Sequence, residues 1–135
     1  MARAEELTVL NFRRTWLTGG WLLVGLVIYL SLTPHPPEPL SFPSADKFEH
    51  AVAYGSLSLW FCQIYLSARS RTIALALLIG LGIALEFVQG WTGYRDFEVL
   101  DMVADSVGVL LGLLLALTPF GRLFVLIEAA LRQIA

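Results

Sequence analysis

Four long apolar stretches constrain this chain more than any other feature of its sequence. They cover residues 16–32, 50–67, 72–89 and 102–120. A helix of about 20 mostly apolar residues crosses the ~30 Å hydrocarbon core of a bilayer. Backbone polar groups in lipid must be satisfied internally, and the stretches lack the period-two alternation of a transmembrane barrel. The sequence therefore predicts an all-α integral membrane bundle of four transmembrane helices.

Composition supports the same class. Hydrophobic residues make up 57% of the 135 residues and charged residues 15%, whereas a typical soluble domain has ~25% charged residues. A soluble domain this small could not bury so much apolar surface, which argues against a soluble enzyme. The net charge of −2 and the single cysteine, Cys62, argue against nucleic-acid binding and against a disulfide scaffold. We expect one membrane domain over residues 1–135.

Basic residues predict the orientation of the spans. Cytoplasmic connections of membrane proteins carry an excess of Lys and Arg. Seven of the nine fall in the N-terminal segment, the second connection and the C-terminal tail: Arg3, Arg13, Arg14, Arg69, Arg71, Arg122 and Arg132. Lys47 and Arg95 fall in the other two connections. Both termini are therefore predicted to be cytoplasmic, with loops 33–49 and 90–101 outside.

The first span also has the basic flank of a signal peptide. No small-x-small cleavage site follows it, so we expect it to remain as an anchor. Cleavage would leave three spans.

The connecting segments carry local signals of their own. Five of the six prolines lie between residues 34 and 43, which predicts an extended loop. Asp46 and Glu49 have the spacing of a capping box at the start of the second span. The link over residues 68–71 is short enough to make spans two and three an antiparallel hairpin. The tail, residues 122–135, is predicted to be an amphipathic helix on the inner membrane surface, with Glu128 and Arg132 as an i, i+4 pair.

Polar side chains recur at helical spacing in three of the spans. Each of these spans presents its polar stripe at its outer end: Asp46, His50 and Tyr54; Glu86 and Gln89; Asp101 and Asp105. Ionisable groups in spans are costly, so they normally face a cavity or one another. We expect these seven side chains to converge on a pocket open to the outside, with Lys47 and Arg95 at its rim.

Structural roles compete with this interpretation. Asp46 could serve only as an N-cap, His50 as a neutral hydrogen-bonded side chain, and Tyr54 as part of an interfacial aromatic belt. Arg95 could pair with Glu86 or Asp101 only to let helices pack. Asp96 and Glu98 are interpreted as solvated loop charges. Two small-xxx-small pairs, Gly108 with Gly112 and Gly80 with Ala84, are predicted to be positions of close helix packing.

The motifs resemble those of a known family. Asp46-Lys47-x-x-His50-x-x-x-Tyr54 resembles the first signature of the VanZ-like membrane proteins, and Glu86-x-x-Gln89 with Arg95, Asp101, Gly108 and Gly112 resembles the second. The match covers about half of the chain. It departs from the family pattern at Asp105, where Asn is usual, and so adds an ionisable group. The resemblance implies a small bacterial inner-membrane protein, in a family whose named member is associated with low-level teicoplanin resistance.

Three functions follow as hypotheses. The first is a binding or resistance accessory protein, whose pocket recognises a lipid-linked cell-wall precursor or a lipophilic glycopeptide through Lys47 and Arg95. The second is a membrane-embedded hydrolase or transferase on such precursors, with Glu86 or His50 as general base. Its ligands for a divalent cation would come from Glu86, Asp101, Asp105 and His50. The third is a small transporter or flippase, which would need a homo-oligomer. The spacing matches no established metal motif, so the sequence predicts no resident cofactor.

Overall fold

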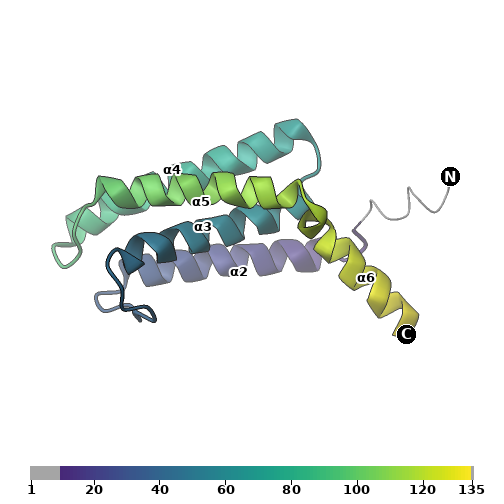
Figure 1. Ribbon diagram of the computed structural model, residues 1–135, viewed down its shortest axis with the longest axis horizontal. Coiled ribbons are helices and arrows are strands. Elements are labelled where there is room, and N and C mark those ends of the chain that lie inside the picture. The colour runs from purple at the N-terminus through teal and green to yellow at the C-terminus, as the bar shows by residue number, and fades with distance from the viewer. Residues whose placement is uncertain (1–9, 135) are drawn as a thin grey trace.

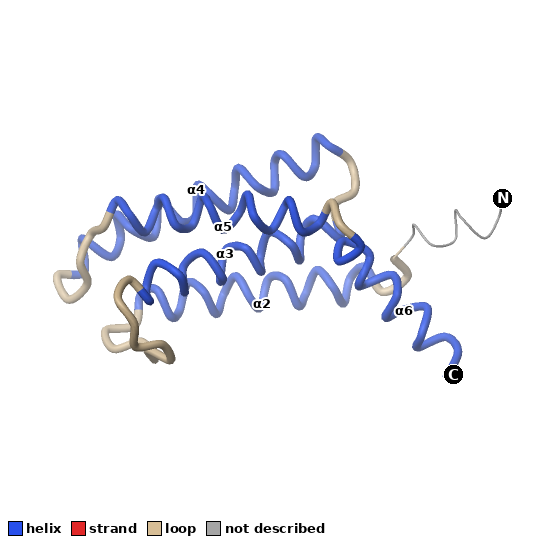
Figure 2. Tube along the Cα trace, viewed as in Figure 1, coloured by secondary structure: helices blue, strands red, loops and turns tan. Residues whose placement is uncertain are grey.

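The computed structural model describes residues 10–134, and within them every regular element is a helix. Four helices lie side by side as a bundle: α2 (Arg13–Leu32), α3 (Ala45–Ile64), α4 (Ala68–Thr92) and α5 (Val99–Ala116) (Figure 1). A short 3₁₀ turn, η2 (Pro119–Arg122), leads into α6 (Leu123–Ile134). The predicted all-α fold is confirmed for these residues. The loop rich in proline is irregular, as predicted, and lies at the same end of the bundle as the α4–α5 loop (Figure 2).

Three of the helices, α2, α4 and α5, are long and apolar enough to cross a membrane. Their outward faces carry large apolar side chains, such as Leu22 on α2 and Leu77 on α4, which are 70% and 68% exposed. An apolar outer surface of this extent is typical of helices that face lipid. The fold thus has the character of a polytopic membrane protein.

Helix α3 is less apolar because Asp46, Lys47, Glu49 and His50 lie in its first turns. It contacts α2, α4 and α5, and most residues of its second half are buried. Polar residues on α3 can therefore face other helices rather than lipid. This enclosure is what allows a charged helix to lie within an otherwise apolar bundle.

Glycines bring α3 and α5 into close contact. A Cβ on Gly108 would collide with the carbonyl oxygen of Ala51, and one on Gly112 would collide with the carbonyl oxygen of Gly55. The close packing predicted for Gly108 and Gly112 is confirmed. The prediction for Gly80 and Ala84 is wrong within this chain, because both residues are exposed and a Cβ on Gly80 would meet nothing within 4 Å.

The ends of the helices differ from the predicted ones in one instructive place. Helix α3 begins at Ala45, and its N-cap residue is Ser44, in the left-handed region with φ 61° and without a side-chain cap. The capping box predicted for Asp46 and Glu49 is therefore wrong. Asp46 lies inside the first turn instead, where its carboxylate is free to pair with Lys47. The predicted hairpin of α3 and α4 is confirmed, but the bounds predicted for its link are wrong: residues 68–71 form the first turn of α4, and the link is at residues 65–67.

The tail forms the predicted amphipathic helix, α6, which leaves the bundle at the end where α2 begins (Figure 1). Its Phe124 ring stacks on Trp16 at 3.9 Å between centroids. Glu128 and Arg132 approach to 3.9 Å, as the i, i+4 spacing predicts. Glu128 nevertheless is not a surface residue, since it is only 1% exposed.

Glu128 instead binds the start of α2. Its carboxylate accepts hydrogen bonds from the backbone N–H of Asn11 at 2.7 Å and of Phe12 at 3.1 Å, and from Trp16 Nε1 at 2.7 Å. N–H groups at a helix start have no intrahelical partner, so this carboxylate caps α2 from another helix. Burial raises the pKa of the Glu128 carboxyl, but these hydrogen bonds outweigh it and hold that pKa below its ordinary value.

Candidate functional site

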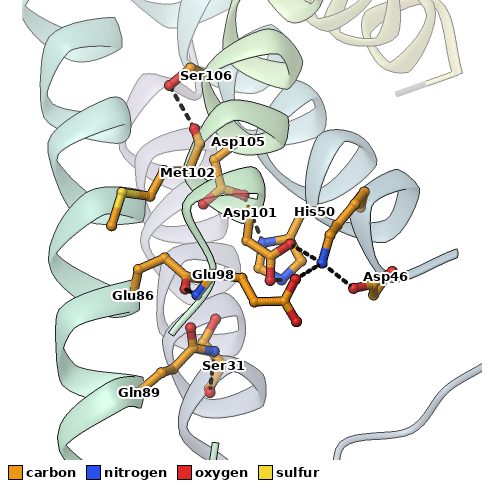
Figure 3. Close-up of polar contacts among 11 residues, drawn as sticks. Ser31, Asp46, His50, Glu86, Gln89, Glu98, Asp101, Met102, Asp105 and Ser106 are labelled. Carbon is orange, nitrogen blue, oxygen red and sulfur yellow. Dashed lines mark hydrogen bonds and ion pairs between the residues drawn. The ribbon is translucent and has the colours of Figure 1, made fainter. Parts of the chain in front are cut away.

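Charged side chains of α3, α4 and α5 meet at the end of the bundle formed by the loops 33–44 and 93–98 (Figure 3). We call them the charged cluster: Asp46, Lys47, His50, Glu86, Glu98, Asp101 and Asp105. Three of the helices contribute, because α3 and α5 begin at this end and α4 ends there. The structure thus brings together most of the polar stripes that the spacing predicts would converge.

Lys47 lies at the centre of the cluster. Its Nζ contacts Asp46 Oδ2 at 2.5 Å and Asp101 Oδ1 at 2.8 Å, and it also pairs with Glu98. The expectation that Lys47 lies at the rim, ready to bind an external anion, is therefore wrong. The first turn of α3 faces the N-terminus of α5, so the Lys47 ammonium pairs with the acidic residues there and not with an external anion.

His50 lies between two carboxylates of α5. Its Nδ1 is 2.9 Å from Asp105 Oδ1, and its Nε2 is 3.6 Å from Asp101 Oδ2. The first distance is a hydrogen bond, and the second is too long for one. Gly82 of α4 makes room for this arrangement, since a Cβ there would lie 2.6 Å from Asp105 Oδ2. The ring is therefore oriented through Nδ1, while Nε2 stays without a hydrogen bond.

Glu86 and Glu98 connect α4 to the start of α5. The Glu86 side chain is 1% exposed, and its Oε2 accepts a hydrogen bond from the Glu98 backbone N–H at 3.0 Å. Glu98 is the N-cap residue of α5, so the carboxylate lies at a helix N-terminus. The interpretation of Glu98 as a solvated loop charge is wrong. Its position three residues before Asp101 was the signal in the sequence, because that spacing puts both on one face.

Tyr54 lies one helical turn after His50, beneath the cluster. It is 2% exposed, so the interfacial-belt interpretation is wrong. Its hydroxyl makes no hydrogen bond within residues 10–134. A buried hydroxyl without a partner is unusual and points to a missing partner on this side.

Besides Tyr54, two predicted site residues lie outside the cluster, Gln89 and Arg95. Gln89 donates from Nε2 to the Ser31 carbonyl at 2.8 Å, next to a bond from the Tyr94 hydroxyl to the Leu32 carbonyl at 2.9 Å. These donors satisfy carbonyls at the C-terminus of α2, which have no intrahelical partner. Arg95 forms no ion pair with any carboxylate in the described part of the chain, so its expected pairing with Glu86 or Asp101 is not found.

A groove of about 870 Å³ adjoins the cluster, between α2, α3 and the loop at residues 36–44. Apolar side chains such as Val27, Leu30 and Val52 form one part of its wall. Its polar part includes Asp46, Glu49, His50, Tyr54 and Arg95. Glu49 Oε1 is buried and has no hydrogen-bond partner among the described residues. The groove therefore joins an apolar surface to an unpaired cation and an unpaired acceptor.

Comparisons with known proteins identify a relative of this chain but do not indicate a function. No family model matches the chain, and no solved structure matches it. The chain is 34% identical over 97 residues to an uncharacterized protein of the yeast Schizosaccharomyces pombe. The match covers 70% of this chain and 57% of the relative, so the chain spans little more than half of the relative's length. The function must therefore be argued from the fold and the charged cluster of this membrane-type protein.

Proposed function

We propose that this chain is a VanZ-like membrane protein of four spans, and that its groove binds an amphiphilic membrane ligand. Helix α3 is the fourth span in this proposal. It has 20 residues, enough for about 30 Å at 1.5 Å per residue, and it lies alongside the three apolar helices. The excess of Lys and Arg in the N-terminal segment, in the first turn of α4 (Arg69 and Arg71) and in the tail supports cytoplasmic termini.

The groove is the observation that carries the binding proposal. Its apolar wall suits an acyl chain, and its polar part suits a headgroup with two functions. Arg95, which has no ion-pair partner, binds a phosphate or carboxylate. Glu49, whose Oε1 lacks a donor, accepts a hydrogen bond from an amine or hydroxyl. Lys47 is excluded from this role because three carboxylates already surround it.

The finer setting comes from the VanZ resemblance. It implies a bacterial inner membrane, a lipid-linked cell-wall precursor or a lipophilic glycopeptide such as teicoplanin as ligand, and a role in the cell envelope. Each such ligand is amphiphilic, as the groove requires. Because a relative of this chain occurs in a yeast, an amphiphile of general membranes is the first probe to use.

Lipid competition tests the binding proposal. The purified protein in detergent micelles with EDTA would be titrated with a fluorescent phosphatidylethanolamine, and unlabelled phosphatidylethanolamine, phosphatidylglycerol and phosphatidylcholine would compete. We expect phosphatidylethanolamine to compete best, because it offers a phosphate to Arg95 and a charged ammonium donor to Glu49. Phosphatidylglycerol offers only neutral hydroxyl donors, and phosphatidylcholine offers no donor. Arg95→Ala should weaken binding about tenfold, which corresponds to one charge-assisted hydrogen bond of roughly 1.5 kcal/mol.

The matched control is Arg69→Ala, which removes an exposed arginine that does not line the groove. It should leave binding unchanged. Equal affinities for Arg95→Ala and the unaltered protein, or equal competition by all three lipids, would refute a headgroup site at this position.

Cysteine labelling tests the topology. The native Cys62 is 1% exposed, so it should contribute little background. In intact cells, a cysteine introduced at Ser41 should react with a membrane-impermeant maleimide, whereas one at Ser67 should react only after lysis. Labelling of both positions from the same side would contradict the proposal that α3, the one helix between them, crosses the membrane.

A further inference from the structure

We propose that His50, Glu86 and Asp101 bind a divalent first-row transition cation, with Asp105 orienting the His50 ring. One imidazole nitrogen and two carboxylate oxygens from these residues all lie within 4.8 Å of one another. They come from three different helices, α3, α4 and α5. Two ligand atoms that each lie about 2.1 Å from one cation are roughly 3 to 3.6 Å apart. The 3.6 Å between His50 Nε2 and Asp101 Oδ2 fits that range.

The surroundings of His50 match those of a metal ligand. Histidines that bind metals usually donate their other ring N–H to a carboxylate, which sets the tautomer and the ring orientation. Asp105 holds Nδ1 at 2.9 Å, so the proton on that nitrogen leaves the Nε2 lone pair directed at the other two ligands. This explains why Asp105 is buried yet not itself one of the three ligands.

The Glu86 carboxylate, like the His50 ring, is oriented by one hydrogen bond. The Glu98 N–H holds Oε2, and Oε1 makes no hydrogen bond with any residue that the structure describes. Figure 3 shows the Glu86 carboxylate on the side of the cluster that faces His50 and Asp101. A carboxylate that is 1% exposed and half satisfied has an oxygen to offer to a cation.

Tyr54 is an independent sign of a missing group. Its hydroxyl is buried and has no hydrogen-bond partner within residues 10–134, and it lies one helical turn after His50 on α3. A water bound to a cation at His50 would supply the absent hydrogen-bond partner.

The charge of the cluster calls for a cation as well. It contains five carboxylates and one ammonium, that of Lys47, in addition to His50. Three of the five carboxylates, those of Glu86, Asp101 and Asp105, are buried, whereas Asp46 and Glu98 are partly exposed. Buried carboxylates are costly unless positive charge compensates them. A second group of acids, Asp46, Glu98 and Asp101, also lies close together. It is not the cation site, because the Lys47 ammonium already lies between these three carboxylates. A set of one nitrogen and two oxygens suits Zn²⁺ or Mn²⁺ better than Mg²⁺ or Ca²⁺.

Metal titration of the full chain tests the proposal. The protein in detergent micelles would be stripped with EDTA, and binding of Zn²⁺ would be measured by equilibrium dialysis with elemental analysis. Binding of Mn²⁺ would be followed by its electron paramagnetic resonance signal. We expect one saturable site per chain. Glu86→Gln should weaken binding at least tenfold, while its amide oxygen can still accept the Glu98 N–H. Asp105→Asn should weaken binding about tenfold through the orientation of His50.

Glu128→Gln is the matched control, because Glu128 is equally buried but lies near the start of α2. It should bind the cation like the unaltered protein. Folding of each variant would be checked by circular dichroism and gel filtration. The absence of a saturable site in the folded unaltered protein would overturn the proposal, as would unchanged affinity in Glu86→Gln. Lipid binding in EDTA is measured separately, so failure of the cation site and failure of the groove are distinguishable.

Discussion

Two buried glutamates, one at each end of the bundle, have opposite surroundings. Glu86 and Glu128 are both 1% exposed. Glu128 is surrounded by donors, two backbone N–H groups and the Trp16 indole among them. Glu86 has one backbone donor, from Glu98, and stands among other carboxylates. Burial alone therefore does not distinguish the two acids, whereas the number of N–H donors around each carboxylate does.

The comparison has a physical reason. A buried carboxylate loses its hydration, and N–H donors replace that hydration at the α6 end. At the other end, within residues 10–134, Lys47 and His50 are the basic side chains that pair with carboxylates of the cluster, of which Glu86, Asp101 and Asp105 are buried. Glu128 is thus a structural capping group, whereas the charged cluster has an excess of negative charge that an added cation would compensate.

The most damaging change should be Gly108→Val, which acts on the contact between α3 and α5 that forms the charged cluster and leaves the Glu128 end unaltered. A side chain at position 108 would meet the backbone of Ala51 and push α3 away from α5, so that His50 loses Asp105. We expect a loss of about 3 kcal/mol or more in the free energy of unfolding. Unfolding in mixed micelles, followed by tryptophan fluorescence, would measure it.

Gly80→Ala is the matched control for Gly108→Val, since Gly80 stands on the open face of α4. Helix propensity predicts that stability will rise by up to about 1 kcal/mol. If the two glycine variants were equally stable, the close contact between α3 and α5 would be wrong.

Lys47→Met should have the next largest effect, because it leaves Asp46, Glu98 and Asp101 without their shared cation. Removing one partner of a buried pair costs about 3 to 5 kcal/mol, and the partial exposure of Lys47 reduces this to roughly 2 kcal/mol. The double variant with Asp101→Asn should recover part of the loss. A double-mutant cycle of unfolding free energies checks this. Strictly additive losses would show that the two side chains do not interact.

Glu128→Gln tests the other end of the comparison. The amide keeps one acceptor but loses the charge, so we expect a loss of about 1 to 2 kcal/mol at neutral pH. The pKa of Glu128 is lowered below its ordinary value of 4.5. Its contribution is therefore complete above pH 4.5 and disappears as the pH falls through the lowered value. The gap in stability between the two proteins should narrow below pH 4.5, and a gap independent of pH would contradict capping by the carboxylate.

The smallest effect is expected for Asp96→Asn. Asp96 and Glu98 look alike in the sequence, yet Asp96 is exposed and contacts no charged partner within residues 10–134. We expect a change within about 0.5 kcal/mol. Glu98→Gln, which disturbs the pairing with Lys47, should cost more in the same unfolding assay. Equal losses of stability in the two variants would mean that Glu98, like Asp96, is only a solvated loop charge.

Much of the candidate site could be predicted because helical spacing is a local property. The i, i+4 recurrence of Asp46, His50 and Tyr54, and of Asp101 and Asp105, is enough to place each set on one face. The cost of charge in an apolar segment then predicts that those faces meet. Arg95 and Gln89 were less predictable, since loop geometry and the open carbonyls at the end of α2 decide where they lie.

The sequence by itself determined the all-α class, the apolar helices and the polar face of each, because these follow from composition and periodicity along a single segment. Only the tertiary structure decided which groups pair. It placed Lys47 among three acids and joined Glu98 to Glu86. It also buried Glu128 against residues more than 110 positions away. The reason is physical: a buried charge takes whichever partner the packing of other helices brings near, and sequence spacing along one helix carries no record of that partner.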